Sequence, residues 1–137
     1  MALEVPNEGT KRFFDIVLNN ITQENLTLKL FKSNTTPAED DTASTYTEAT
    51  FTGYAAVTLT LGSWTVTLGS GATKTLAAYA QQTFTSSANQ TTENEYGYYI
   101  VGATSNKLYW AERFTSGPFP IANNGDTIKV TPQITGD

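Results

Sequence analysis

The sequence predicts an all-β fold, namely an antiparallel β-sandwich of jelly-roll or Greek-key type with one short N-terminal helix. Apolar and polar residues alternate in about eight short runs, and clusters of turn-forming residues separate these runs. About 25 of the 137 residues are threonine, which favours strands. Because strands do not alternate with helical segments, a parallel sheet is not expected. The length fits a single domain over 1–137.

One helical pattern lies near the start of the chain, over residues 8–20. Asn7 can cap this helix, Glu8 suits its positive end, and Asn19-Asn20 is a stop signal. The apolar residues recur at spacings of three and four and form a single stripe: Phe13, Phe14, Val17, Leu18 and Ile21. We expect this stripe to pack on the β-rich remainder of the chain.

The remaining chain alternates with the period of a strand. The predicted strands occupy 26–30, 55–61, 64–68, 78–85, 96–101, 107–114 and 128–134. The polar stretch 33–41 between the first two is a predicted surface loop. Residues 96–101 and 107–114 form the clearest hairpin. Asn123-Asn124-Gly125-Asp126 predicts a turn, and Pro132 places the last strand at an edge or a bulge.

Several classes of function are disfavoured by composition. The chain has no histidine and no cysteine, which removes the usual zinc sites, iron–sulfur clusters, disulfides and His-dependent nucleophilic triads. A net charge of -5 argues against nucleic-acid binding. No apolar stretch is long enough for a membrane span, and the first residues lack signal-peptide features. We therefore expect a soluble protein made in the cytoplasm, without a cofactor.

Two groups of carboxylates are the candidates for site chemistry. Glu39-Asp40-Asp41 could bind calcium, but the three acids are consecutive and no turn glycine follows, so a solvated loop is the better interpretation. Glu112, beside Trp110, could act in a glycosidase together with a second acid. The possible second acids are Glu48, Glu93 and Glu95. An ion-paired or solvent-facing strand residue is the favoured alternative for Glu112, and we expect no enzymatic activity.

Aromatic residues form the third candidate group. They could build a platform that stacks on sugars, as in carbohydrate-binding modules, or they could fill the core of the sandwich. The residues concerned are Trp64, Tyr98, Tyr99, Tyr109 and Trp110. Core packing is the commoner use of such residues, and we favour it here.

Several stretches together resemble small virion proteins encoded among the structural genes of tailed bacteriophages. The likeness covers most of the chain. It is carried by ALEVPNEG at 2–9, TPAEDDT at 36–42, YTEATFTGY at 46–54, GYYIV at 97–101, WAERF at 110–114 and NGDTIKV at 124–130.

The resemblance implies a structural, non-enzymatic role, foremost that of a capsid decoration (cement) protein. Such a protein would lie on the outside of the virion head and bind the major capsid protein and copies of itself, as a dimer or trimer. The alternative is a carbohydrate- or receptor-binding module of a phage tail or fibre, since the sequences of such modules are also β-rich and rich in threonine. The family has no catalytic motif to carry over to this chain.

Six apolar residues are candidates for the interface. Leu3, Val5 and Pro6 lie before the helix, where residues 1–7 could form an arm that reaches a neighbouring subunit. Tyr54, Phe119 and Ile121 are the further candidates. For each of the six, packing within its own domain is the alternative.

Overall fold

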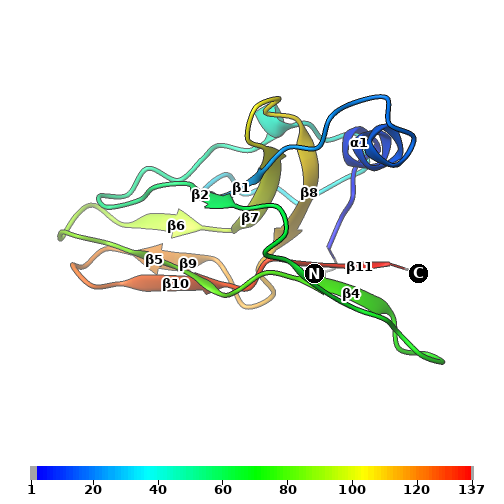
Figure 1. Cartoon of the computed structure of the whole chain (residues 1–137). Helices are drawn as coiled ribbons and strands as arrows, with labels where there is room; N and C mark the ends of the chain where they lie inside the picture. Colours follow the sequence, from blue (N-terminus) through cyan, green and yellow to red (C-terminus); the bar gives the residue numbers. More distant parts are fainter. Residues whose placement is uncertain (1–2, 137) are drawn as a thin grey trace.

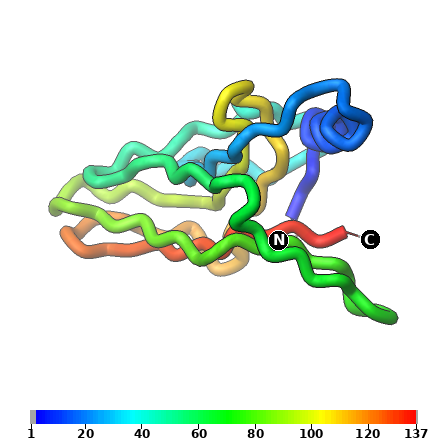
Figure 2. The backbone as a smooth tube through the Cα atoms, in the orientation of Figure 1, coloured from blue at the N-terminus to red at the C-terminus, as the bar shows by residue number. Residues whose placement is uncertain are grey.

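The computed structural model describes residues 3–136, shown as a cartoon in Figure 1 and as a backbone tube in Figure 2. It contains one α-helix, α1 (Asn7–Val17), and one short 3-10 helix, η1 (Ala43–Thr45). The strands are β1 (Leu26–Phe31), β2 (Val57–Leu59), β3 (Thr65–Thr67), β4 (Thr75–Ala78), β5 (Gln82–Thr85), β6 (Glu93–Glu95), β7 (Gly97–Gly102), β8 (Leu108–Arg113), β9 (Phe119–Ile121), β10 (Thr127–Val130) and β11 (Gln133–Gly136). The predicted all-β class with a single α-helix is confirmed.

The largest sheet has four antiparallel strands in the order β2-β1-β7-β8. β1 pairs with β7 over its whole length, from Leu26 opposite Gly102 to Phe31 opposite Gly97. β7 and β8 form the predicted hairpin, with a shift in register between Ile100 and Val101. All six residues of β7 are buried, so this strand is the centre of the fold.

Three smaller sheets complete the molecule: β10-β5, β11-β4-β3 and β6-β9. The main core lies between the four-stranded sheet and the strands β5, β9 and β10, which Figure 1 shows as a second layer. Side chains from both layers meet there, including Leu28 and Ile100 from one and Phe84, Ile128 and Val130 from the other. The two layers make an antiparallel sandwich.

A second apolar cluster covers the opposite face of the four-stranded sheet. Tyr46, just after η1, lies against Phe31 and Tyr99, with ring centroids 4.9 and 5.1 Å apart. Val101 and Leu108 extend this cluster along β7 and β8. Because both faces of β7 are covered, its side chains are apolar or aromatic in succession and do not alternate with polar ones.

Two predicted strands are each divided in the structure. Residues 78–85 form parts of β4 and β5, which belong to different sheets, and 128–134 form parts of β10 and β11. Pro132 lies between β10 and β11, because it has no N–H to donate to a ladder. The predicted turn at Asn123–Asp126 is confirmed, with Gly125 at a φ of 92°.

Helix α1 begins one residue before the predicted start and ends three residues before the predicted end. Pro6 is the N-cap, with a φ of -63°, and Asn7 is the first helical residue and not the cap. Asn19 adopts the left-handed conformation, φ 58°, just past the helix, so the predicted stop at Asn19 is confirmed. No helix within residues 3–136 is long and apolar enough to cross a membrane.

Candidate functional site

Helix α1 lies unusually close to strand β8, and Gly9 makes this approach possible. Gly9 is buried, and a Cβ atom at this position would lie only 1.9 Å from the backbone oxygen of Tyr109. Only a residue without a side chain fits there. The helix is therefore seated directly on the backbone of the sheet.

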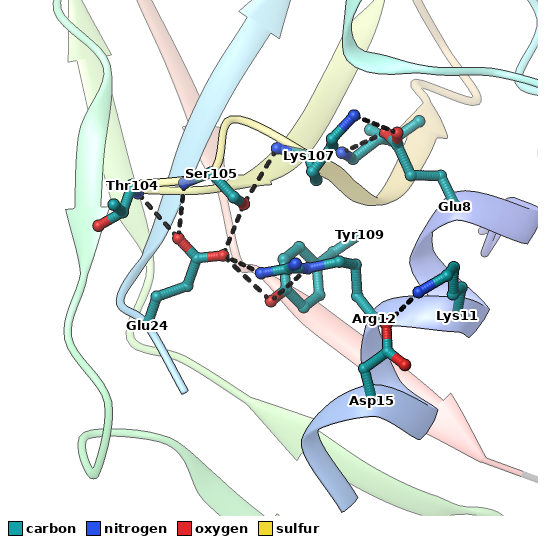
Figure 3. A network of polar contacts seen from close by, with 10 residues as sticks. Glu8, Lys11, Arg12, Asp15, Glu24, Thr104, Ser105, Lys107 and Tyr109 are labelled. Atoms are coloured by element: carbon teal, nitrogen blue, oxygen red, sulfur yellow. Dashed lines mark hydrogen bonds and ion pairs between the residues drawn. The ribbon is translucent and has the colours of Figure 1, made fainter. Parts of the chain in front are cut away.

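Polar contacts fix the first turns of α1 to the β7–β8 hairpin, as Figure 3 shows. The backbone N–H of Leu108 donates to Glu8 Oε2 at 2.8 Å, and Lys107 Nζ lies 3.4 Å from Glu8 Oε1. One turn later, Arg12 Nη2 lies 2.5 Å from Glu24 Oε1. The Arg12 guanidinium also lies over the Tyr109 ring, 5.7 Å from its centroid.

Glu24 connects this helix to the turn between β7 and β8 (Figure 3). Its carboxylate accepts hydrogen bonds from the backbone N–H groups of Thr104 and Ser105, at 2.8 and 2.9 Å, and from Ser105 Oγ at 2.6 Å. Burial opposes ionisation, but the hydrogen bonds from Ser105, Thr104 and Arg12 outweigh it and lower the pKa of Glu24 to about 2. Glu24 is thus ionised, and its hydrogen bonds and its ion pair with Arg12 hold α1 in place.

The apolar residues of α1 divide into an anchoring set and an exposed set. Phe13 contacts Tyr109 edge-on, with ring centroids 5.5 Å apart, and Ile16 also packs against the core. Phe14, Val17 and Leu18 are 63%, 80% and 69% exposed. The prediction that the whole stripe packs on the sheet is therefore wrong for these three, since the anchored face is already filled by Phe13 and Ile16. We call Phe14, Val17 and Leu18 the α1 apolar face.

The described part of the predicted arm, residues 3–7, docks on its own domain, and residues 1–2 lie outside the described residues. Glu4 and Ala111 exchange both backbone hydrogen bonds, at 2.9 and 3.0 Å, so the arm covers the free edge of β8. Pro6 is fully buried, and Leu3 and Val5 pack against the main core. Pro6 is therefore not available to a partner, because the interior of its own subunit covers it.

The other three interface candidates also have contacts inside the chain. Ile121 is fully buried in the main core, which excludes it from an interface. The Tyr54 hydroxyl donates to Glu48 Oε1 at 3.0 Å while its ring stacks on Phe84. Phe119 remains 38% exposed, although its ring contacts Phe114.

The aromatic candidates for a sugar platform fill the interior. Tyr98, Tyr99, Tyr109 and Trp110 are all buried, and the half-buried Trp64 packs edge-on against Trp110, with centroids 5.8 Å apart. Such rings cannot stack on a ligand from solvent, so the structure favours core packing for this group.

The predicted acids have structural partners, with one exception. Glu112 accepts a hydrogen bond from the Tyr98 hydroxyl at 2.7 Å, and Glu48 pairs with Lys29. Glu93 receives several hydrogen bonds, and Glu95 is the exception: it is fully buried, and no donor group among the described residues reaches either of its oxygens.

Residues of the acidic loop 39–41 accept hydrogen bonds from neighbouring parts of the chain. Asp41 accepts hydrogen bonds from the Ala38 N–H at 2.9 Å and the Tyr46 hydroxyl at 2.7 Å, and the backbone oxygen of Glu39 accepts one from the Asn7 N–H. Among residues 3–136, no group of three or more acidic side chains gathers in a way that could hold a metal ion.

Sequence reasoning missed the residues that position α1, namely Gly9, Arg12 and Glu24. The spacing of Arg12 and Glu24 in the chain gives no signal for their pairing, because a turn of variable path separates them. No protein-family model, curated protein or solved structure matches this chain.

Proposed function

We propose that this chain is a structural protein of a tailed-bacteriophage virion, a capsid decoration protein that binds the outside of the head shell through the major capsid protein. The observation that carries the proposal is the α1 apolar face, a set of three large exposed apolar side chains, of which Phe14 and Val17 lie in the helix and Leu18 is its C-cap. Exposed apolar groups of this kind mark protein–protein contacts. The virion assignment itself comes from the sequence resemblance.

The α1 apolar face is well suited to binding because it is held rigidly before a partner arrives. Gly9, Glu8 and Arg12 fix the helix to the sheet, so little conformational entropy is lost when it docks. Full burial of one such side chain contributes roughly 1.5–3 kcal/mol. Three of them give a contact of modest strength, and the symmetry of a shell multiplies it.

Binding to head shells that lack the protein tests the proposal. We expect Val17→Lys to weaken binding about thirtyfold, since it removes about 2 kcal/mol of apolar burial. Gln23→Lys is the matched control, because it adds the same charge at an exposed position in the loop that follows. Equal effects of both variants would mean that charge, not the α1 apolar face, controls binding.

The location in the virion is tested separately by cryo-microscopy of whole particles. We expect density for this fold on the head surface, with α1 turned toward the shell. Density at the tail, or the absence of the protein from particles, would reject the decoration role.

A further inference from the structure

The hairpin formed by β3 and β4 projects from the body of the molecule (Figures 1 and 2). In its sheet, β11-β4-β3, the strand β4 lies in the middle and β3 is at one edge. Within the described residues, β4 is the only strand that pairs with β3. The outer edge of β3 therefore presents unpaired backbone N–H and C=O groups.

One face of this sheet continues the main core outward. Trp64, at the base of the hairpin, packs against Trp110. Two residues further, on the same face, Val66 stands opposite Ala77, and Ala77 opposite Ile134. At the outer end, Val66 and Leu68 are 68% and 86% exposed. The alternation in 64–68 predicted a strand correctly, but the domain itself does not cover its outer apolar side chains.

The edge lacks the features that prevent strands from pairing. The segment Ser63-Trp64-Thr65-Val66-Thr67-Leu68-Gly69 contains no charged residue and no proline. Edge strands of monomeric proteins normally carry a charge, a proline or a bulge, or another segment covers them. The edge of β8 illustrates the last case, because the Glu4 backbone covers it.

We propose that β3 pairs antiparallel with β3 of a second copy of this chain, about a two-fold axis at Val66. The segment is self-complementary in this register. Thr65 of one copy stands opposite Thr67 of the other, Val66 opposite Val66, and Trp64 opposite Leu68. Apolar residues then meet apolar residues and threonine meets threonine, which are favourable cross-strand pairs. The two three-stranded sheets become one continuous sheet.

The area that this contact buries indicates how strongly the two copies bind each other. Pairing of the five-residue segment 64–68, which includes β3, with its exposed side chains buries on the order of 500 Å² per copy, near the lower limit for a specific interface. We therefore expect a micromolar dimer in solution. The inference does not depend on the head-shell assignment, because it concerns the isolated protein.

Cross-linking tests the register. The chain has no cysteine, so Val66→Cys introduces a single thiol at the proposed axis. We expect this variant to form a covalent dimer rapidly with a short bis-maleimide. Val17→Cys, a similarly exposed valine on α1, is the matched control and should react much more slowly. Equal rates for the two variants would overturn the proposed register.

Sedimentation velocity over a concentration series tests the dimer itself. The wild type should sediment as a dimer at high concentration, and Leu68→Lys should weaken dimerisation at least tenfold by placing a charge at the edge. Val17→Lys should leave dimerisation unchanged. A wild type that stays monomeric at about 1 mM would overturn the proposal. A dimer that Val17→Lys disrupts and Leu68→Lys does not would place the contact on α1.

The outcomes for the two proposals are separable. If the β3 proposal fails, Leu68→Lys leaves sedimentation unchanged whatever the protein binds. If the head-shell proposal fails, Val17→Lys leaves binding to shells unchanged whatever the oligomeric state.

Discussion

Gly9 and Glu24 set the position of α1, Gly9 by a close backbone approach and Glu24 by a group of polar contacts. At Gly9, the missing side chain lets the helix rest on the Tyr109 carbonyl. The carboxylate of Glu24 joins Arg12 of the helix to the turn at Ser105, and Ser105 lies 81 residues after Glu24 in the sequence. Because the helix is held at both points, Phe13 faces the core and its neighbour Phe14 faces solvent.

Gly9→Ala should displace α1 from the sheet. The added methyl group would overlap the Tyr109 carbonyl, so we expect the free energy of unfolding to fall by about 2 kcal/mol. Urea denaturation measures the change. Gly136→Ala is the control, because no atom lies within 4 Å of the Cβ it would add, and it should alter stability by less than about 0.5 kcal/mol. Equal stability of both variants would contradict the close approach of α1.

Strand β6 carries two carboxyl groups with opposite behaviour. Glu93 accepts hydrogen bonds from the N–H groups of Thr50 and Phe51, at 2.6 and 2.8 Å, and pairs with Lys32. Burial opposes its ionisation, but these contacts outweigh burial and lower its pKa to about 2. Burial raises the pKa of Glu95 to about 8, and both a side-chain hydrogen bond with Glu93 and the negative charge of Glu93 add to this effect.

The protonation of Glu95 predicts a decrease in stability as the pH rises. In the unfolded chain its pKa is near 4.5, and in the fold it is about 8. Between these values the folded protein holds a proton that the unfolded chain has lost, so the free energy of unfolding falls by up to about 1.4 kcal/mol per pH unit. The contribution of Glu95 to stability is therefore complete below pH 4.5 and is lost as the pH rises to about 8.

Glu95→Gln should remove this dependence, because an amide does not titrate. Thermal unfolding measured from pH 5 to pH 8 checks it. The control is Glu39→Gln, the same substitution in an exposed loop, which should retain the wild-type slope. A slope that persists in Glu95→Gln would assign the dependence to other groups.

Across the whole molecule, burial is concentrated around β7 and decreases toward the β3–β4 hairpin. β7 is buried at every residue and paired on both sides by β1 and β8. β3 is exposed at every residue and paired on one side. The outer strand β3 therefore contributes little to the stability of the subunit that carries it.

Amide hydrogen exchange should follow this gradient. We expect β7 to exchange by global unfolding alone and β3 to exchange much faster in the dilute protein. Mass spectrometry at low and high concentration checks both, and the outward-facing β3 amides should gain protection as dimers form. Exchange in β3 as slow as in β7 at the lowest concentration would contradict the gradient.

Local sequence patterns were enough to predict several elements. The helix near 8–20, the hairpin of 96–101 and 107–114, and the turn at Gly125 are confirmed with small shifts of boundary. Each depends on residues close together in the chain: spacing of three and four, alternation, or a glycine in a turn. The all-β class follows from the same short-range information.

Only the tertiary structure decided which apolar residues are buried and which strands are partners. Periodicity placed Phe14 and Val66 on apolar faces, but other elements determined that both face solvent. The division of 78–85 between two sheets and the burial of Glu95 likewise depend on distant segments. The physical reason is that periodicity fixes the direction of a side chain relative to its own element, whereas burial requires a second surface that the rest of the chain must supply.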